Sequence, residues 1–295
     1  NSYAHIGGIA GSAQGTSDSH ITITDCTNGA AITGTENYHA GIVGHANYVD
    51  ISGCTNTAAI SGSSYLGGIV GSNNGYNGSM VISNCTNSGN VTGTSNYVGG
   101  IAGESWYSTI TGCTNSGKIE AASSAIGGIC GYVHNYYHNI INCKNTGNVK
   151  GTGIYSYYVG GIAGWSESES NYTRCSNEGT VESLSYYVGG IVGWATGTNV
   201  IDECSNKGAV KSTTASTSQS YGVGGIVGYL YNKSTIRNSY NTGAISSSCT
   251  YKTAPSTSNY NYGVGGIAGA SNGIGTSSYN YIENCYNIGT VYGSS

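Results

Sequence analysis

One unit recurs nine times along this chain of 295 residues. Each copy opens with Gly-Gly-Ile, then Ala, Val or Cys, then Gly; the second copy has Ala40-Gly41 in place of the glycine pair. The isoleucines of this first block are Ile9, Ile42, Ile69, Ile101, Ile129, Ile162, Ile191, Ile226 and Ile267. Because one such unit is too small to bury its own apolar side chains, the copies are expected to stack and share one core.

A second block, Ile-x-x-Cys-x-Asn, follows the first in each copy. Its cysteines are Cys26, Cys54, Cys85, Cys113, Cys143, Cys175, Cys204 and Cys285, and Ser239 takes this place in the eighth copy. The asparagine two residues later is present in all nine copies, at Asn28, Asn56, Asn87, Asn115, Asn145, Asn177, Asn206, Asn241 and Asn287. A third block supplies one aliphatic residue six positions after the cysteine, from Ile32 in the first copy to Val291 in the last.

These blocks are typical of short strands joined by turns. They are rich in Ile, Val, Thr and Tyr, they are bounded by Gly, Asn and Ser, and none carries the 3.6-residue apolar repeat of a helix. The sequence therefore predicts an all-β fold, a parallel β-helix of about nine turns with roughly three short strands per turn. We expect a corner at pairs such as Ser52-Gly53, and either another corner or a close backbone contact at the glycine pair.

Residues 1–295 are predicted to form a single repeat domain. Neither end shows a polar capping segment, which a stacked array needs, so we expect a fragment or a processed part of a longer surface protein. Nine Lys and Arg against thirteen Asp and Glu argue against a nucleic-acid partner. The chain has no apolar run long enough for membrane insertion, and no Cys, His or acid spacing that predicts a metal or another cofactor.

The repeat unit resembles the GLUG-motif repeat. The residues that carry the likeness run from Tyr187, through Gly-Gly-Ile-Val-Gly, to Val210, and the same pattern covers essentially the whole chain. The family often has Leu where this chain has Ile, and Ser where it has Cys. Such repeats occur in large bacterial surface proteins, including adhesins and IgA-cleaving metalloproteases. The resemblance implies an extracellular or cell-surface location and a role as a stalk or adhesive region, and it carries over no catalytic residue.

The repeated cysteines and asparagines are interpreted as structural ladders. Ten cysteines in an extracellular chain would usually indicate disulfides, but the eight periodic ones predict an inward column of buried free thiols, as does Cys130. Cys249 lies in a long loop and is the most reactive candidate. We expect the asparagine amides to bond from turn to turn, at a position where Asn tolerates left-handed backbone geometry.

Aromatic residues provide the candidate ligand-binding surface. Three positions after the first-block Ile, four consecutive copies carry Tyr132, Trp165, Trp194 and Tyr229. A second column precedes the glycine pair, at Tyr38, Tyr65, Tyr97, Tyr158 and Tyr187. Ring stacking along these columns would stabilise a rod without any ligand. The alternative is a platform for sugar rings or a protein partner, because Tyr and Trp are frequent at binding hot spots.

We interpret the chain as a non-catalytic adhesin stalk or binding rod for a host or neighbouring-cell glycan or protein. One alternative is a subunit of an extracellular fibre that assembles end to end through its terminal strands. Another is a polysaccharide-active β-helix enzyme, which would need paired carboxylates. The candidates are Asp202 with Glu203, which point to different faces of an extended chain, and Glu167 with Glu169, which have no evident His or Arg partner. No enzymatic activity is therefore expected.

Overall fold

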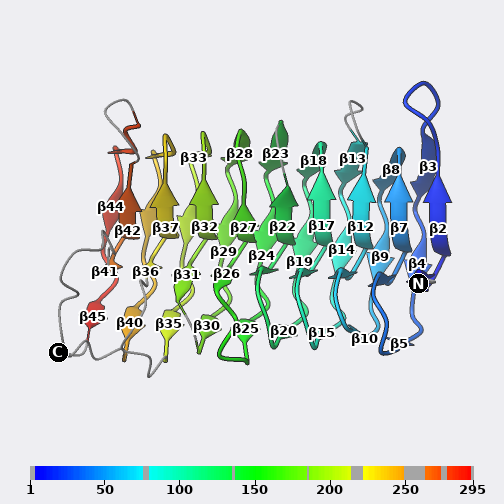
Figure 1. Cartoon of the computed structure of the whole chain (residues 1–295), viewed down its shortest axis with the longest axis horizontal. Helices are drawn as coiled ribbons and strands as arrows, with labels where there is room; N and C mark the ends of the chain where they lie inside the picture. The colour runs from blue at the N-terminus through cyan, green and yellow to red at the C-terminus, as the bar shows by residue number, and fades with distance from the viewer. Residues whose placement is uncertain are drawn as a thin grey trace.

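The chain folds into a rod of nine stacked turns (Figure 1). The structure is a computed structural model, and it describes residues 4–75, 80–134, 137–184, 186–213, 222–248, 263–273 and 278–293. In these residues it has no helix, and all five sheets are parallel and nine strands wide. The predicted all-β parallel solenoid is thus confirmed.

Each turn contributes one strand to each sheet, and the sheets are numbered here in the order in which a turn visits them. The first sheet contains β1 (Ile6–Gly7), β6 (His39–Ala40), β11 (Leu66–Gly67), β16 (Val98–Gly99), β21 (Ile126–Gly127), β26 (Tyr158–Gly160), β31 (Tyr187–Gly189), β36 (Gly222–Gly224) and β41 (Gly263–Gly265). The second contains β2 (Ala10–Gln14), β7 (Val43–Asn47), β12 (Val70–Asn74), β17 (Ala102–Trp106), β22 (Cys130–His134), β27 (Ala163–Ser166), β32 (Val192–Thr196), β37 (Val227–Tyr231) and β42 (Ala268–Asn272).

The other three sheets complete the turn. The third contains β3 (Ile21–Thr24), β8 (Val49–Ser52), β13 (Met80–Ser83), β18 (Ser108–Thr111), β23 (His138–Ile141), β28 (Ser170–Thr173), β33 (Val200–Asp202), β38 (Thr235–Arg237) and β43 (Tyr281–Glu283). The fourth contains β4 (Thr27–Asn28), β9 (Thr55–Asn56), β14 (Thr86–Asn87), β19 (Thr114–Asn115), β24 (Lys144–Asn145), β29 (Ser176–Asn177), β34 (Ser205–Asn206), β39 (Tyr240–Asn241) and β44 (Tyr286–Asn287). The fifth contains β5 (Ile32–Thr33), β10 (Ile60–Gly62), β15 (Val91–Gly93), β20 (Ile119–Ala121), β25 (Val149–Gly151), β30 (Val181–Ser183), β35 (Val210–Ser212), β40 (Ile245–Ser247) and β45 (Val291–Gly293).

Each turn therefore has five strands, where the sequence indicated roughly three. The first two blocks each bend once, and the bend divides each into two strands. A two-residue strand such as β19 carries no alternating apolar pattern, so it leaves no signal in the sequence.

The corner predicted within the second block is present in every turn. The residue before the cysteine position has a left-handed backbone, with φ between 50° and 63°, at Asp25, Gly53, Asn84, Gly112, Asn142, Arg174, Glu203, Asn238 and Asn284. The ladder asparagines lie three residues further on, in the strands of the fourth sheet, and none of them has a positive φ. The expectation that the ladder asparagines have a left-handed backbone was therefore wrong, because the corner lies three residues before each asparagine.

The core is made of two apolar layers that run the length of the rod. One contains the first-block isoleucines and the cysteine column, and the other contains the third-block aliphatic residues and the residue before the glycine pair. The described cysteines are free; they are buried in the inner turns and partly exposed at Cys26 and Cys285 in the end turns. Burial raises the pKa of the Cys54 thiol to about 11, so it stays protonated at neutral pH. Cys249 lies outside the described residues.

The asparagine side chains form a continuous amide ladder. Each Nδ2 donates to the Oδ1 of the next turn's asparagine at 2.7 or 2.8 Å, from Asn28 to Asn287. The same Nδ2 also donates to the carbonyl oxygen two residues further along its own turn, as Asn115 does to Gly117 at 2.9 Å. Both amide hydrogens of each inner asparagine are therefore satisfied.

The second glycine of each pair makes room for this ladder. A Cβ atom on Gly100 would lie 2.1 Å from the Gly128 carbonyl oxygen and 2.4 Å from the Asn115 Cγ, and both atoms are fixed in place. The close backbone contact anticipated at the glycine pair is thus present. Glycine is needed here for lack of space, not for backbone conformation.

Substitution of this glycine should disrupt the stack. Gly100→Ala is expected to lower the free energy of unfolding by about 3 kcal/mol, because neither the backbone nor the ladder can move away. Gly29→Ala is the matched control, since its added Cβ would meet nothing closer than the Thr57 Oγ1 at 3.8 Å. Urea denaturation followed by circular dichroism measures both, and equal stability of the two variants would contradict this account.

Removal of one asparagine from the ladder should also lower the stability of the fold. Asn115→Ala leaves the Asn87 Nδ2 and the Asn145 Oδ1 without their ladder partners in a buried position. We expect the free energy of unfolding to fall by about 3 kcal/mol, since each unsatisfied buried group costs roughly 1–3 kcal/mol. Thr114→Ala, at the partly exposed neighbouring position, should change it little. A midpoint of urea unfolding that is the same for both variants would refute the structural role of the ladder.

Candidate binding surface

The four aromatic residues singled out in the sequence lie on the outer face of the second sheet. Tyr132, Trp165, Trp194 and Tyr229 occupy the same register position in β22, β27, β32 and β37. Tyr132 and Tyr229 are 4% and 8% exposed, and the two tryptophans are partly exposed. The repeat therefore brings all four into one column.

Their rings stack on one another along the rod. The ring centroids of Tyr132 and Trp165 are 4.5 Å apart, and those of Trp165 and Trp194 are 5.5 Å apart with the rings only 8° from parallel. The Trp194 and Tyr229 rings are tilted and lie 6.3 Å apart. Because each inner ring is covered on both faces by its neighbours, the part left toward solvent is its edge.

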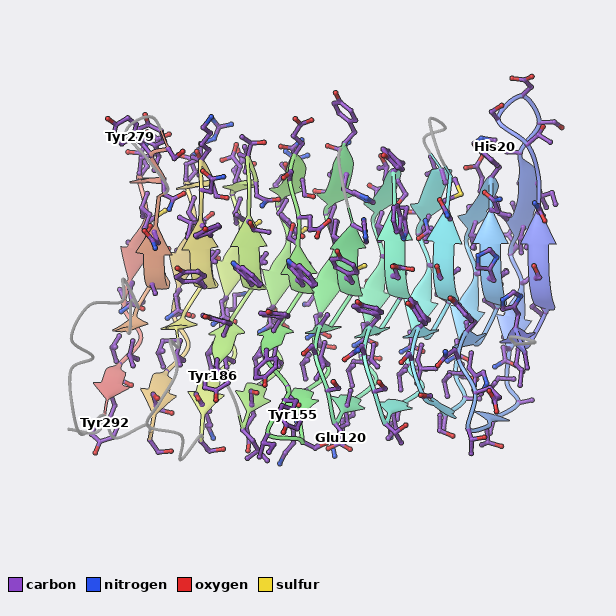
Figure 2. The ribbon with its side chains drawn as sticks, in the orientation of Figure 1. His20, Glu120, Tyr155, Tyr186, Tyr279 and Tyr292 are labelled. Atoms are coloured by element: carbon purple, nitrogen blue, oxygen red, sulfur yellow. The ribbon has the colours of Figure 1, made fainter. Side chains whose placement is uncertain are left out.

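The second tyrosine column joins the first. Tyr65 and Tyr97 are 5.0 Å apart, and Tyr97 stacks on Tyr132 at 5.0 Å, so the stack passes from one column to the other at the fifth turn. Tyr158 lies 4.7 Å from Trp194. We name the combined set the aromatic band: Tyr38, Tyr65, Tyr97, Tyr132, Tyr158, Trp165, Tyr187, Trp194 and Tyr229. Figure 2 shows ring side chains following one another along the rod.

Polar groups interrupt the band at the fourth to sixth turns. Glu104 takes the aromatic position in β17, is 8% exposed, and accepts a hydrogen bond from the Ser72 Oγ at 3.0 Å. Burial raises the pKa of its carboxyl, while hydrogen bonds from Ser72 and Trp106 act in the opposite direction. Trp106 stacks on His134 with the ring centroids 3.5 Å apart. Sequence reasoning missed this cluster because its members differ from turn to turn.

Glu167 belongs to the same cluster. One of its carboxylate oxygens lies 3.5 Å from the His134 Nδ1. The expectation that Glu167 has no His or Arg partner was therefore wrong, because the stacking of turns brings together residues 33 positions apart. Burial raises the pKa of the neighbouring Tyr132 hydroxyl, and the adjacent Glu167 raises it further.

Comparison with known proteins identifies the repeat. The family model described as "The GLUG motif" matches residues 94–120, 122–150 and 219–246. This chain carries GLUG-motif repeats. The fold is similar to that of a crystal structure described as "a putative immunoglobulin A1 protease from Bacteroides ovatus", with a TM-score of 0.55 and 17% identity over 92% of this chain and 86% of that one. That identity supports a shared fold only. A search of curated proteins finds no match.

Of the other candidate carboxylates in the GLUG-repeat rod, Asp202 and Glu203 are held in ion pairs, whereas the ion pairs among the described residues do not include Glu169. Asp202 accepts from the Arg237 guanidinium at 2.8 Å and from the Asn238 Nδ2 at 2.8 Å, in the following turn. Glu203 lies 3.4 Å from the Arg174 Nη1, in the preceding turn. The two carboxylates therefore engage partners on opposite sides along the rod axis.

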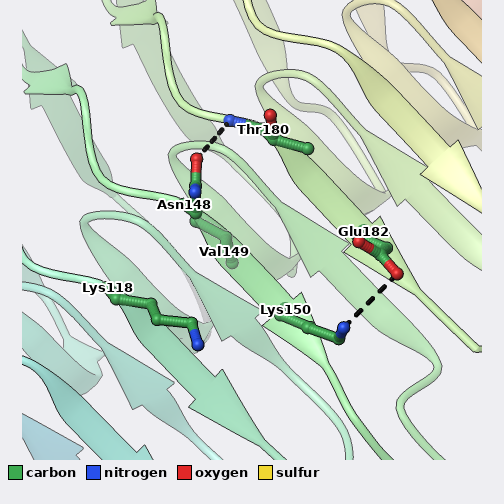
Figure 3. Close-up of a pocket in the computed structure, with 6 residues that line it drawn as sticks. All are labelled: Lys118, Asn148, Val149, Lys150, Thr180 and Glu182. Atoms are coloured by element: carbon green, nitrogen blue, oxygen red, sulfur yellow. Dashed lines mark hydrogen bonds and ion pairs between the residues drawn. The ribbon is translucent and has the colours of Figure 1, made fainter.

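A shallow cavity of about 220 Å³ lies over the fifth sheet, lined by Lys118, Asn148, Val149, Lys150, Thr180 and Glu182 (Figure 3). Lys118 pairs with Glu120 at 2.7 Å, and Lys150 pairs with Glu182 at 3.5 Å. The lysines are thus already neutralised, and opposite charges on adjacent strands favour the observed register. We interpret this cavity as part of the packing of turns.

Metal-binding clusters and membrane-spanning helices are both absent from the described part of the chain. No group of three or more His, Cys, Asp or Glu side chains there is arranged to hold a metal ion. None of its segments is a helix of the length and apolarity that a membrane span requires.

The buried Glu104 predicts a pH effect on stability. Its carboxyl has a higher pKa in the folded chain than in the unfolded chain, so the folded state holds the proton more tightly. Stability should therefore fall as pH rises from 4.5 through the folded-state pKa. Glu104→Gln keeps a hydrogen-bond acceptor for Ser72 without the charge.

Thermal unfolding of this variant and of the original chain between pH 4 and 7 measures the effect. The difference in melting temperature should shift in favour of Glu104→Gln as pH increases. Glu120→Gln, on the fifth sheet, controls for the loss of one negative charge. A difference that is independent of pH would show that Glu104 keeps its ordinary pKa.

Proposed function

We propose that these GLUG repeats form a non-catalytic extracellular rod that binds a glycan or a protein on a host or neighbouring cell. The observation that carries the proposal is the aromatic band: nine Tyr and Trp side chains from consecutive turns share one face of a rigid rod. Seven of the nine are partly exposed, and Tyr132 and Tyr229 are buried between them. A row of partly exposed aromatic side chains is characteristic of an interaction surface.

The geometry of the band supports contact through ring edges. Rings that are already stacked lose little conformational freedom when a partner binds, which favours affinity. Tyr158, Trp165 and Trp194 are partly exposed, but the indole Nε1 atoms of both tryptophans are buried, so these two residues offer a partner the apolar part of their ring edges. Repetition of such weak contacts along several turns would multiply the affinity of each one.

The extracellular location and the absence of catalysis are part of the same proposal. The location rests on the GLUG motif, since repeats of this kind occur in bacterial surface proteins. Several potential catalytic carboxylates are already paired, Asp202 with Arg237 and Glu203 with Arg174. We assign no catalytic residue to this chain by analogy with the protein described as a putative protease, because 17% identity supports a shared fold alone.

The two tryptophans at the centre of the band provide the test. Trp165→Ala combined with Trp194→Ala is expected to weaken binding at least tenfold, because hot-spot aromatics contribute 2 kcal/mol or more. The measurement uses glycans and purified cell-surface proteins on arrays, and then affinity determination for the ligands that the original chain binds. Tyr155→Ala is the matched control, since this residue is 59% exposed and lies outside the band.

Thermal unfolding separates lost contacts from lost folding. A less disruptive variant, Trp165→Phe with Trp194→Phe, preserves stacking and should retain more of the affinity. If the double alanine variant bound a ligand of the original chain as tightly as the original chain does, the aromatic band would not be the binding surface.

A further inference from the structure

The centre of the aromatic band carries two carboxylates and is far from most of the positive charges of the chain. Glu104 occupies the aromatic position of β17, and Glu167 directly follows β27, two turns further along. The described strands of the first and second sheets contain no Lys or Arg. Lys233, in the loop between β37 and β38, lies two turns beyond Glu167. The other described Lys and Arg residues lie on or beside the third, fourth and fifth sheets.

The two carboxylates act on the same two tyrosine hydroxyls. Burial raises the pKa of the Tyr97 hydroxyl, and Glu104 and Glu167 raise it further. Tyr132 stacks on Tyr97 at 5.0 Å, and the pKa of its hydroxyl is raised by burial, by Glu167 and, to a smaller extent, by Glu104. Charges act in this way only over short distances. The centre of the band is therefore a region of negative charge bordered by rings.

This region is open to solvent at several side chains. The Glu167 side chain is 25% exposed, whereas Glu104 is 8% exposed. The rings of Tyr97 and Trp106 are partly exposed. Trp106 stacks on His134, and among the described residues no second ring stacks on it. A cation beside these rings would gain a cation–π attraction in addition to its attraction to the carboxylates.

The chemistry of the region selects one class of cation. A metal ion does not fit, because no three His, Cys, Asp or Glu side chains of the described residues are arranged to hold one. A neutral glycan would cover the carboxylates without a compensating charge, which is unfavourable. Lys and Arg side chains lay an apolar stem along ring surface and carry the charge at the tip. Their stems suit the ring edges of the band, and their head groups suit the two carboxylates.

We infer that the centre of the aromatic band binds a basic segment of a partner protein, with Lys or Arg head groups beside Glu104 and Glu167 and their stems along the neighbouring rings. The occupant is thus a polypeptide, since several such side chains on one chain match the length of the band. This inference rests on the proposed function, because it names the partner of the same surface.

Fluorescence anisotropy with a labelled peptide of alternating lysine and serine, blocked at both ends, measures the binding to the full chain. The same peptide with every lysine acetylated keeps the length and removes the charge. We expect the acetylated peptide to bind about tenfold more weakly or less, because it cannot pair with the carboxylates. The affinity of the lysine peptide should also fall as salt is added, since the carboxylates are near the surface.

Glu104→Gln combined with Glu167→Gln tests the two carboxylates. This variant should bind the lysine peptide about tenfold more weakly than the original chain does. Glu120→Gln combined with Glu182→Gln, on the fifth sheet, is the matched control, because it removes the same charge away from the band. It should bind as the original chain does. Circular dichroism verifies that both variants are folded.

Three results would overturn the inference: no binding of the lysine peptide by the original chain, equal binding of the two peptides, or equal losses in the two glutamine variants. The tryptophan variant Trp165→Ala with Trp194→Ala distinguishes these failures from failure of the proposed function. If that variant lost a neutral glycan that the original chain binds, and the lysine peptide did not bind, the band would still be a binding surface but not for a basic segment.

Discussion

The contact between each ladder asparagine and the second glycine of the repeat is the constraint on which this structure depends. The amide occupies the space that a side chain at the glycine would fill, so the two residues require each other although they lie about 15 to 20 positions apart in sequence. The amide is then held on one side by its own turn and on the other by the next asparagine. A slip of one residue between turns would break the bond to the next asparagine, while the bond within the turn would remain. The ladder therefore fixes the register from which every other column follows.

Register has different consequences for different side chains. An in-register parallel stack places equivalent residues of successive turns about 4.8 Å apart. This spacing favours amides and aromatic rings, which bond or stack with copies of themselves, and it disfavours repeated charges. The chain has only 7% charged residues. Where charges occur in consecutive turns they alternate in sign, as in the column Glu120, Lys150, Glu182 and Lys211.

Most of this fold could be predicted from the sequence because its period is visible in the residues that form the core. The cysteine and isoleucine columns, the corner near Gly53 and the contact at the glycine pair each follow from recurrence. The number of strands per turn could not be predicted, since a two-residue strand is too short to show an alternating apolar pattern in the sequence. The cluster of Glu104, His134 and Glu167 could not be found either. Its members occupy different positions in different turns, so only the three-dimensional stack relates them.

The candidate site shows how stacking changes the meaning of a sequence pattern. A row of Tyr and Trp indicates a platform on which sugar rings could lie flat. In the structure the flat faces of the inner rings are occupied by the neighbouring rings, as between Trp165 and Trp194. A sugar ring therefore has little free aromatic face to cover within the band. Contacts with the ring edges remain, and they repeat at the spacing of the turns, while the indole nitrogens of Trp165 and Trp194 are buried. A partner suited to this surface is an extended one that makes similar contacts at each step along the rod, which is why we relate the function to the length of the band and not to a single pocket.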